Sequence, residues 1–215
     1  MKYGESAFDV LYLLFAIISG CRILKHAKNR TETNMGAAAL ILGCGDAFHL
    51  VPRVLNYFSS ADLTAALGIG KLVTSVTMTV FYVIVYRIWL GVYNEKEDPG
   101  TLRTVLVLVT VRILLCLFPQ NGWLQNSSDM TWGILRNVPF VLLGALIITL
   151  FYRKRTQNKR FGSFWLLILL SFLFYIPVAV GAGAVPMLGM LMLPKTVCYI
   201  LMIVVFLNSV FKDKE

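Results

Sequence analysis

Seven apolar stretches, each long enough to cross a lipid bilayer as a helix, most restrict how this chain can fold. A transmembrane helix needs about 20 mostly apolar residues. The stretches cover residues 6–25, 35–58, 65–92, 101–119, 132–152, 162–181 and 185–211. Because the connections between them are short, neighbouring helices are expected to pack antiparallel. We therefore predict an all-α integral membrane bundle of seven transmembrane helices, formed as a single domain by residues 1–215.

The composition argues against a soluble protein. Of the 215 residues, 58% are hydrophobic and 14% are charged, whereas soluble domains carry about 25% charged residues. The net charge of +9 does not indicate a nucleic-acid partner, because the basic residues lie in short connections between apolar stretches. Membrane lipids are the expected partners, and the bacterial plasma membrane is the predicted location. The four cysteines lie in apolar stretches without a CxxC pair, so neither a disulfide framework nor a structural zinc site is predicted.

The basic residues in the connections and at the adjoining ends of the apolar stretches alternate between the two sides of the predicted bundle. They cluster around the first, third and fifth connections and in the C-terminal tail: Arg22, Lys25, Lys28, Arg30, Arg87, Lys96, Arg103, Arg153, Lys154, Arg155, Lys159, Arg160, Lys212 and Lys214. Short loops rich in Lys and Arg stay on the cytoplasmic side of a membrane. The N-terminus is therefore predicted outside and the C-terminus in the cytoplasm. Glu5 and Asp9 precede the apolar run of the first stretch and four basic residues follow it, so it is predicted to be a retained helix and not a signal peptide.

A second set of ionisable residues lies within the apolar stretches: Asp9, Asp46, His49, Arg53, Lys71, Arg112, Arg136 and Lys195. A charge at the centre of a bilayer costs roughly 2.5–3.5 kcal/mol on insertion scales, so these residues need mutual pairing, a water-filled cavity or a ligand. The predicted orientation places almost all of them in the outer half of the bundle. They are expected to line a polar cavity that opens outward. Cations outnumber carboxylates in this set, which suits an anionic group such as phosphate or carboxylate.

The stretch 35–58 carries the densest group of these residues. Asp46, His49, Arg53 and Asn56 are spaced by three, four and three residues, which places them on one helix face. Asp46 and His49 lie one turn apart and are the predicted catalytic pair, because a carboxyl and an imidazole can act as general acid and base. The alternative is a buried Asp–Arg pair that only ties this helix to its neighbours. Both interpretations remain open at this point.

Other polar residues in the apolar stretches are predicted to hold the ligand. Lys195 follows a proline within the last stretch, and Arg136 lies close to another proline. The predicted ligand-binding set is Arg53, Lys71, Arg112, Arg136, Asn137, Tyr175, Lys195 and Tyr199. Neither a P-loop nor a GxSxG or HExxH pattern occurs. One histidine among the intramembrane residues is too few for a histidine-rich metal site, so no metal and no cofactor are predicted.

The nine residues Gly45–Arg53, with the sequence Gly-Asp-Ala-Phe-His-Leu-Val-Pro-Arg, resemble a motif of the lysoplasmalogenase (YhhN-type) membrane family. Ser171 and the pair Cys198–Tyr199 are weaker similarities. The resemblance implies hydrolysis of the vinyl-ether bond of lysoplasmalogens, with catalytic importance for Asp46. The chain departs from the family in two ways. The family usually has eight helices with this motif on the third, and Phe172 stands where a second acidic residue is expected.

Three classes of function follow from these observations. The first is an intramembrane hydrolase that acts on an anionic amphiphile. The second is a receptor, sensor or carrier for a small organic anion; carriers often show internal repeats, and none is evident here. A retinal Schiff base on Lys195 is disfavoured within this class, because the stretch 65–92 offers no carboxylate counter-ion. The third is a purely structural role for the polar residues. No oligomeric state is predicted.

Overall fold

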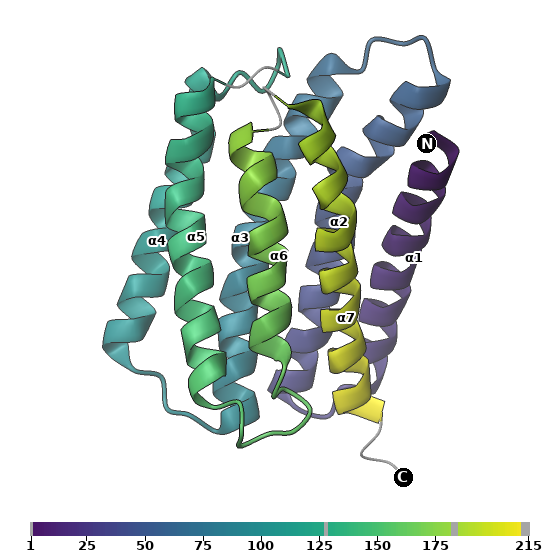
Figure 1. Ribbon diagram of the computed structural model, residues 1–215. Helices are drawn as coiled ribbons and strands as arrows, with labels where there is room; N and C mark the ends of the chain where they lie inside the picture. The colour runs from purple at the N-terminus through teal and green to yellow at the C-terminus, as the bar shows by residue number, and fades with distance from the viewer. Residues whose placement is uncertain (1, 127–128, 182–184, 212–215) are drawn as a thin grey trace.

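Over the residues that the structure describes, the chain folds into a bundle of seven helices that are long and apolar enough to cross a membrane, which confirms the predicted number (Figure 1). The computed structural model describes residues 2–126, 129–181 and 185–211, and the predicted tail lysines Lys212 and Lys214 lie outside these ranges. No strand occurs in the described ranges. The elements are α1 Lys2–His26, α2 Arg30–Phe58, α3 Thr64–Tyr93, α4 Pro99–Leu117, η1 Pro119–Asn121, α5 Met130–Arg153, α6 Phe164–Gly181, η2 Pro186–Leu191 and α7 Met192–Phe211.

Local capping explains where two of the helices begin. The Asn29 side chain accepts a hydrogen bond of 2.9 Å from the Glu32 amide, so α2 begins five residues before the predicted start. Asp98 caps α4 in the same way, accepting from the Thr101 amide at 2.7 Å. This amide hydrogen bond lowers the pKa of Asp98 below its ordinary value. Capping of this kind stabilises helix starts, because the first four amides of a helix lack partners within it.

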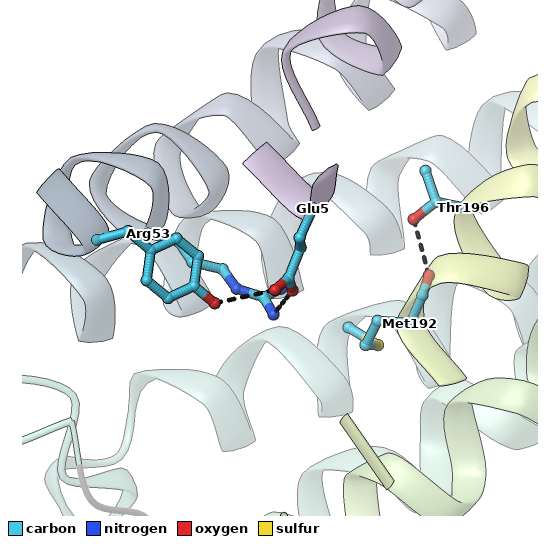
Figure 2. A network of polar contacts seen from close by, with 5 residues as sticks. Glu5, Arg53, Met192 and Thr196 are labelled. Atoms are coloured by element: carbon cyan, nitrogen blue, oxygen red, sulfur yellow. Dashed lines mark hydrogen bonds and ion pairs between the residues drawn. The ribbon is translucent and has the colours of Figure 1, made fainter. Parts of the chain in front are cut away.

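The seventh predicted stretch is divided into two helical segments. A short 3₁₀ helix covers Pro186–Leu191, and the α-helix begins only at Met192. Within the first turns of α7, the Thr196 hydroxyl donates a hydrogen bond of 2.9 Å to the Met192 carbonyl (Figure 2). This is the back-bond of a helical threonine to the carbonyl four residues earlier, and it holds the Thr196 side chain against its own helix. The division places Lys195 in the first turn of α7 and not within a longer helix.

Helix α3 lies at the centre of the bundle and packs against α2, α4 and α5. The approach of α2 to α3 depends on small residues: a Cβ added at Gly45 would lie 2.2 Å from Oγ1 of Thr77. On its other side, the buried Tyr82 ring of α3 lies 5.4 Å from Phe140 of α5 and 5.3 Å from Phe172 of α6, between ring centroids. Aromatic packing of this kind forms the core of the bundle.

The bundle has two ends of different chemistry. We call the end at which α1 begins the N-terminal end and the opposite one the C-terminal end; they lie at the top and bottom of Figure 1. Near the C-terminal end the core is aromatic, with the buried rings of Phe151, Phe161, Phe164 and Phe206. The ionisable residues gather toward the N-terminal end, because they lie late in α2 and α4 and early in α1, α3, α5 and α7.

Candidate functional site

Two adjoining cavities lie in the N-terminal half of the bundle. The first, which we call the cationic cavity, has an empty volume of about 690 Å³, including the part open to solvent. Its ionisable lining residues are Lys71, Arg112, Arg136, Lys195 and His49. The second, which we call the acidic cavity, has an empty volume of about 520 Å³. Its charged lining residues are Glu5, Asp9, Asp46, Arg53 and Lys195, and His49 lines it as well.

This arrangement differs from the single polar cavity expected from the sequence. Arg53, Asp46 and Tyr199 line the acidic cavity, whereas Lys71, Arg136 and Tyr175 line the cationic one. His49, Thr74, Met192 and Lys195 line both cavities and form the wall between them. The ionisable residues lie at similar distances from the N-terminal end of the bundle, but they belong to helices on opposite sides of this wall. They therefore line two cavities.

Arg112 is the most deeply buried of the predicted ligand-binding residues, at 1% exposure. Its Nε donates to Oγ1 of Thr79 at 3.0 Å, and its Nη1 donates to the Arg136 carbonyl at 2.5 Å and to Oδ1 of Asn137 at 3.0 Å. The guanidinium also lies 4.0 Å from the centroid of the Phe140 ring. Its Nη2 donates to none of the described residues. Arg112 is therefore held rigidly by α3 and α5 while two N–H groups remain available at the cationic cavity.

Asn137 and Tyr175 form a chain of hydrogen bonds that ends at Arg112. The Tyr175 hydroxyl donates to Oδ1 of Asn137 at 2.7 Å, and Nδ2 of Asn137 donates to the Gly133 carbonyl at 2.8 Å. Because Oδ1 of Asn137 also accepts from Arg112, the amide orientation is determined by its neighbours. Asn137 does not line the cationic cavity. It positions the Arg112 side chain by accepting its hydrogen bond.

Arg136 and Lys71 are held by the connection between α4 and α5. Nη1 of Arg136 donates to Oδ1 of Asn121 at 2.6 Å, and its guanidinium lies 4.4 Å from the Trp123 ring centroid. Nζ of Lys71 donates to Oδ1 of Asn126 at 2.7 Å. Asn121 is itself buried, and its Nδ2 donates to backbone carbonyls at the end of α4. This connection therefore forms part of the wall of the cationic cavity.

Lys195 occupies the wall between the two cavities. Its side chain is 8% exposed, and it forms neither a hydrogen bond nor an ion pair with the described residues. Nζ lies 4.8 Å from the Tyr175 ring centroid and 5.3 Å from that of Tyr199. Two aromatic faces stabilise a buried ammonium group only in part. Nζ thus keeps three donors for a ligand in either cavity.

Asp46 and His49, the predicted catalytic pair, are not bonded to each other. Oδ2 of Asp46 accepts a hydrogen bond of 2.7 Å from the Tyr12 hydroxyl, and the positive charge of Lys195 acts on this carboxyl group. Nδ1 of His49 is buried and has no hydrogen-bond partner among the described residues. The acid of this pair therefore faces the acidic cavity, while the imidazole lies in the wall between the cavities.

Arg53 has a partner that the sequence interpretation did not include. Its guanidinium forms an ion pair with Glu5 near the start of α1 (Figure 2). The Tyr57 hydroxyl donates to the second oxygen of Glu5 at 3.1 Å. Asn56, predicted on the same face as Arg53, is exposed. Because Arg53 is paired and lines the acidic cavity, it does not add to the charge of the cationic cavity.

Several site residues had only weak signals in the sequence. Glu5 and Asp9 lie four residues apart in α1, and this spacing indicates a shared face with two carboxylates. Tyr12 and Thr79 had no signal, since hydroxyls are common in apolar helices. Asn121 and Trp123 lie in a connection, where no helical spacing indicates which way a side chain points.

No protein-family model, curated protein sequence or solved structure matches this chain. The resemblance of Gly45–Arg53 to the lysoplasmalogenase family therefore stays a prediction. Within the described ranges, no group of three or more His, Cys, Asp or Glu side chains is arranged to hold a metal ion.

Proposed function

We propose that the cationic cavity binds the anionic group of a small organic anion or of an anionic amphiphile. The observation that carries the proposal is the charge of the lining: Lys71, Arg112, Arg136 and Lys195 surround the cavity, and none of its described lining residues is Asp or Glu. Unpaired cations in an apolar bundle are costly and mutually repulsive. A phosphate, sulfate or carboxylate group in the cavity offsets both effects.

The donors that face the cavity are already oriented for an anion. The hydrogen bonds of Arg112 to Thr79 and Asn137 hold its guanidinium in place. The stacking of Arg136 on Trp123 does the same for the second guanidinium. Preoriented donors lose little conformational entropy when a ligand binds, so more of the interaction energy contributes to affinity. Guanidinium groups also match the planar, two-oxygen geometry of phosphate and carboxylate.

An apolar groove beside the cavity supports an amphiphilic ligand. It lies between α5 and α6, has an empty volume of about 610 Å³, and shares Tyr175 with the cationic cavity. The exposed apolar side chains of the groove are Ile134, Val138, Leu142, Ile176 and Val180. An acyl chain in this groove would cover its apolar side chains, and the anionic head of the same molecule would bind the cations of the cavity.

Displacement of radiolabelled sulfate from the protein in phosphatidylcholine nanodiscs tests the proposal. We expect saturable binding, and we expect Arg136→Gln and Lys195→Gln each to weaken it by about 10- to 100-fold, the range for losing a charge-assisted hydrogen bond. Decyl sulfate should displace sulfate more effectively than methyl sulfate. Lys159→Gln, at the C-terminal end, is the matched control and should bind as the unmodified protein does. Equal affinities for all these variants would contradict the proposal.

The shared wall supports a second candidate, hydrolysis of the bound lipid at a vinyl-ether bond. His49 and Lys195 line both cavities, so a lipid head held by the cations lies next to the cavity of the Asp46 carboxyl. Protonation of the alkene carbon by Asp46 would begin this reaction. The same nanodiscs, incubated with a vinyl-ether lysophospholipid, report aldehyde release. Release that persists in Asp46→Asn would exclude Asp46 as the acid.

We further propose that the N-terminal end of the bundle faces outward, at a bacterial plasma membrane, so that both cavities lie in the outer half. The support is the distribution of Lys and Arg, which concentrate in the α1–α2, α3–α4 and α5–α6 connections and in the helix ends beside them. Cysteines introduced at exposed positions test it. Ser60→Cys, in the α2–α3 connection, should react with a membrane-impermeant maleimide in intact cells. Gln157→Cys, in the α5–α6 connection, should react only after lysis; the reverse pattern would invert the topology.

A further inference from the structure

Asp9 of α1 is a buried carboxyl group without a hydrogen-bond partner among the described residues. The residue is 4% exposed, and its Oδ2 forms no hydrogen bond with the described part of the chain. The neighbouring Oγ of Ser6, one turn earlier, is also buried without a partner. Asp9 lines the acidic cavity. A carboxylate in this position has lost its water and gained no hydrogen-bond donor, so its charged form carries a desolvation cost that the nearby charge of Arg53 offsets only in part.

The other charges around the acidic cavity do not supply the missing partner. Arg53 of α2 forms its ion pair with Glu5 of α1, and its charge acts on Asp9 without a hydrogen bond or an ion pair between them. Asp46 of α2 accepts from Tyr12 and lies in the field of Lys195 of α7. The cavity thus has three carboxylates and two permanent cations, with His49 of α2 as its remaining titratable lining residue apart from Tyr199. One positive charge is missing, and a proton is the smallest group that supplies it.

We infer that Asp9 binds a proton and that this proton is taken up together with the anion in the cationic cavity. The inference rests on the proposed anion binding. The physical link is Lys195, which lines both cavities. An anion that arrives beside Lys195 offsets the positive charge that acts on Asp46. It also adds negative charge next to a cavity in which Glu5, Asp9 and Asp46 already repel one another. Their protonated forms then become more favourable, and Asp9 has no donor to keep it ionised.

Linkage requires the reverse effect to have the same size. If anion binding favours protonation of Asp9, protonation of Asp9 must favour anion binding by the same factor. The sulfate affinity should therefore rise as the pH falls, by up to about tenfold per pH unit when one proton accompanies each anion. Coupled uptake of an anion and a proton is what a carrier for organic anions driven by a proton gradient requires.

Sulfate titrations between about pH 5 and about pH 8 test the inference, because sulfate keeps its charge in this range and the groups of interest do not. We expect Asp9→Asn, which resembles the protonated acid, to bind sulfate with little dependence on pH and with undiminished affinity near neutral pH. Asp62→Asn removes an exposed loop carboxylate and should keep the full dependence. His49→Gln should keep it too, although its affinity changes.

Three results would overturn the inference: a full pH dependence in Asp9→Asn, its loss in His49→Gln, or an affinity set by sodium concentration and not by pH. Proton uptake by the unmodified protein, measured with an indicator dye in weak buffer when sulfate is added, tests the same point without a variant; no uptake would also overturn it. Absence of saturable sulfate binding at every pH would instead contradict the proposed function, so the two failures are distinguishable.

Discussion

Replacing Arg112 by alanine is expected to lower the free energy of unfolding by about 2–4 kcal/mol and to abolish measurable sulfate binding. The substitution removes the hydrogen bonds to Thr79, Asn137 and the Arg136 carbonyl, and it leaves an empty volume beneath the Phe140 ring. It also removes a buried cation, which by itself would favour the folded state. We expect the losses to prevail, because three hydrogen bonds and the contact with the Phe140 ring disappear together.

Two buried cysteines allow this effect to be measured. Cys116 and Cys198 are buried, whereas Cys21 and Cys44 are exposed. In a background with the exposed pair changed to alanine, a thiol-reactive dye reports unfolding during a denaturant titration in micelles. Arg103→Ala, on the exposed surface of the same helix, is the control and should change stability by less than about 0.5 kcal/mol. A stability for Arg112→Ala equal to that of this control would contradict the role assigned to Arg112.

Replacing Gly70 by alanine is expected to have the second large effect, because it forces α2 and α3 apart beside the site. The added Cβ would lie 2.1 Å from the Phe48 carbonyl oxygen and 2.8 Å from Cα of His49. Both atoms belong to the backbone of α2, so no side-chain rotation relieves the contact. We expect a loss of stability of about 1–3 kcal/mol and a fall in sulfate affinity of at least about tenfold. His49 and the adjacent Lys71 must move with the separating helices.

Gly4→Ala is the matched control for this substitution. A Cβ at Gly4 meets no atom within 4 Å, although Gly4 also lies in a helix near the N-terminal end. Alanine has the higher helix propensity, so this variant should be as stable as the unmodified protein or more stable by up to about 1 kcal/mol. Thermal unfolding and sulfate titration of both variants provide the comparison. Unchanged sulfate affinity in Gly70→Ala would show that the α2–α3 contact does not shape the cavity.

The sequence alone determined the helices and the depth of their polar residues. A run of about 20 apolar residues predicts a spanning helix because a lipid bilayer leaves few other ways to satisfy the backbone. The seven helices follow from this rule, and the position of Lys195 or Arg136 along its stretch gives its distance from the helix end. The sequence alone therefore predicts the surplus of cations near one end of the bundle.

Only the tertiary structure decided which groups meet. Arg53 pairs with Glu5 and not with Asp46, which lies nearer in the sequence, and Asp46 accepts instead from Tyr12. Helical spacing specifies the face of a residue on its own helix, but a partner on another helix depends on how both are rotated and how closely they approach. That rotation is set by packing between distant segments, such as Gly45 against Thr77. For this reason one expected cavity became two, separated by His49 and Lys195.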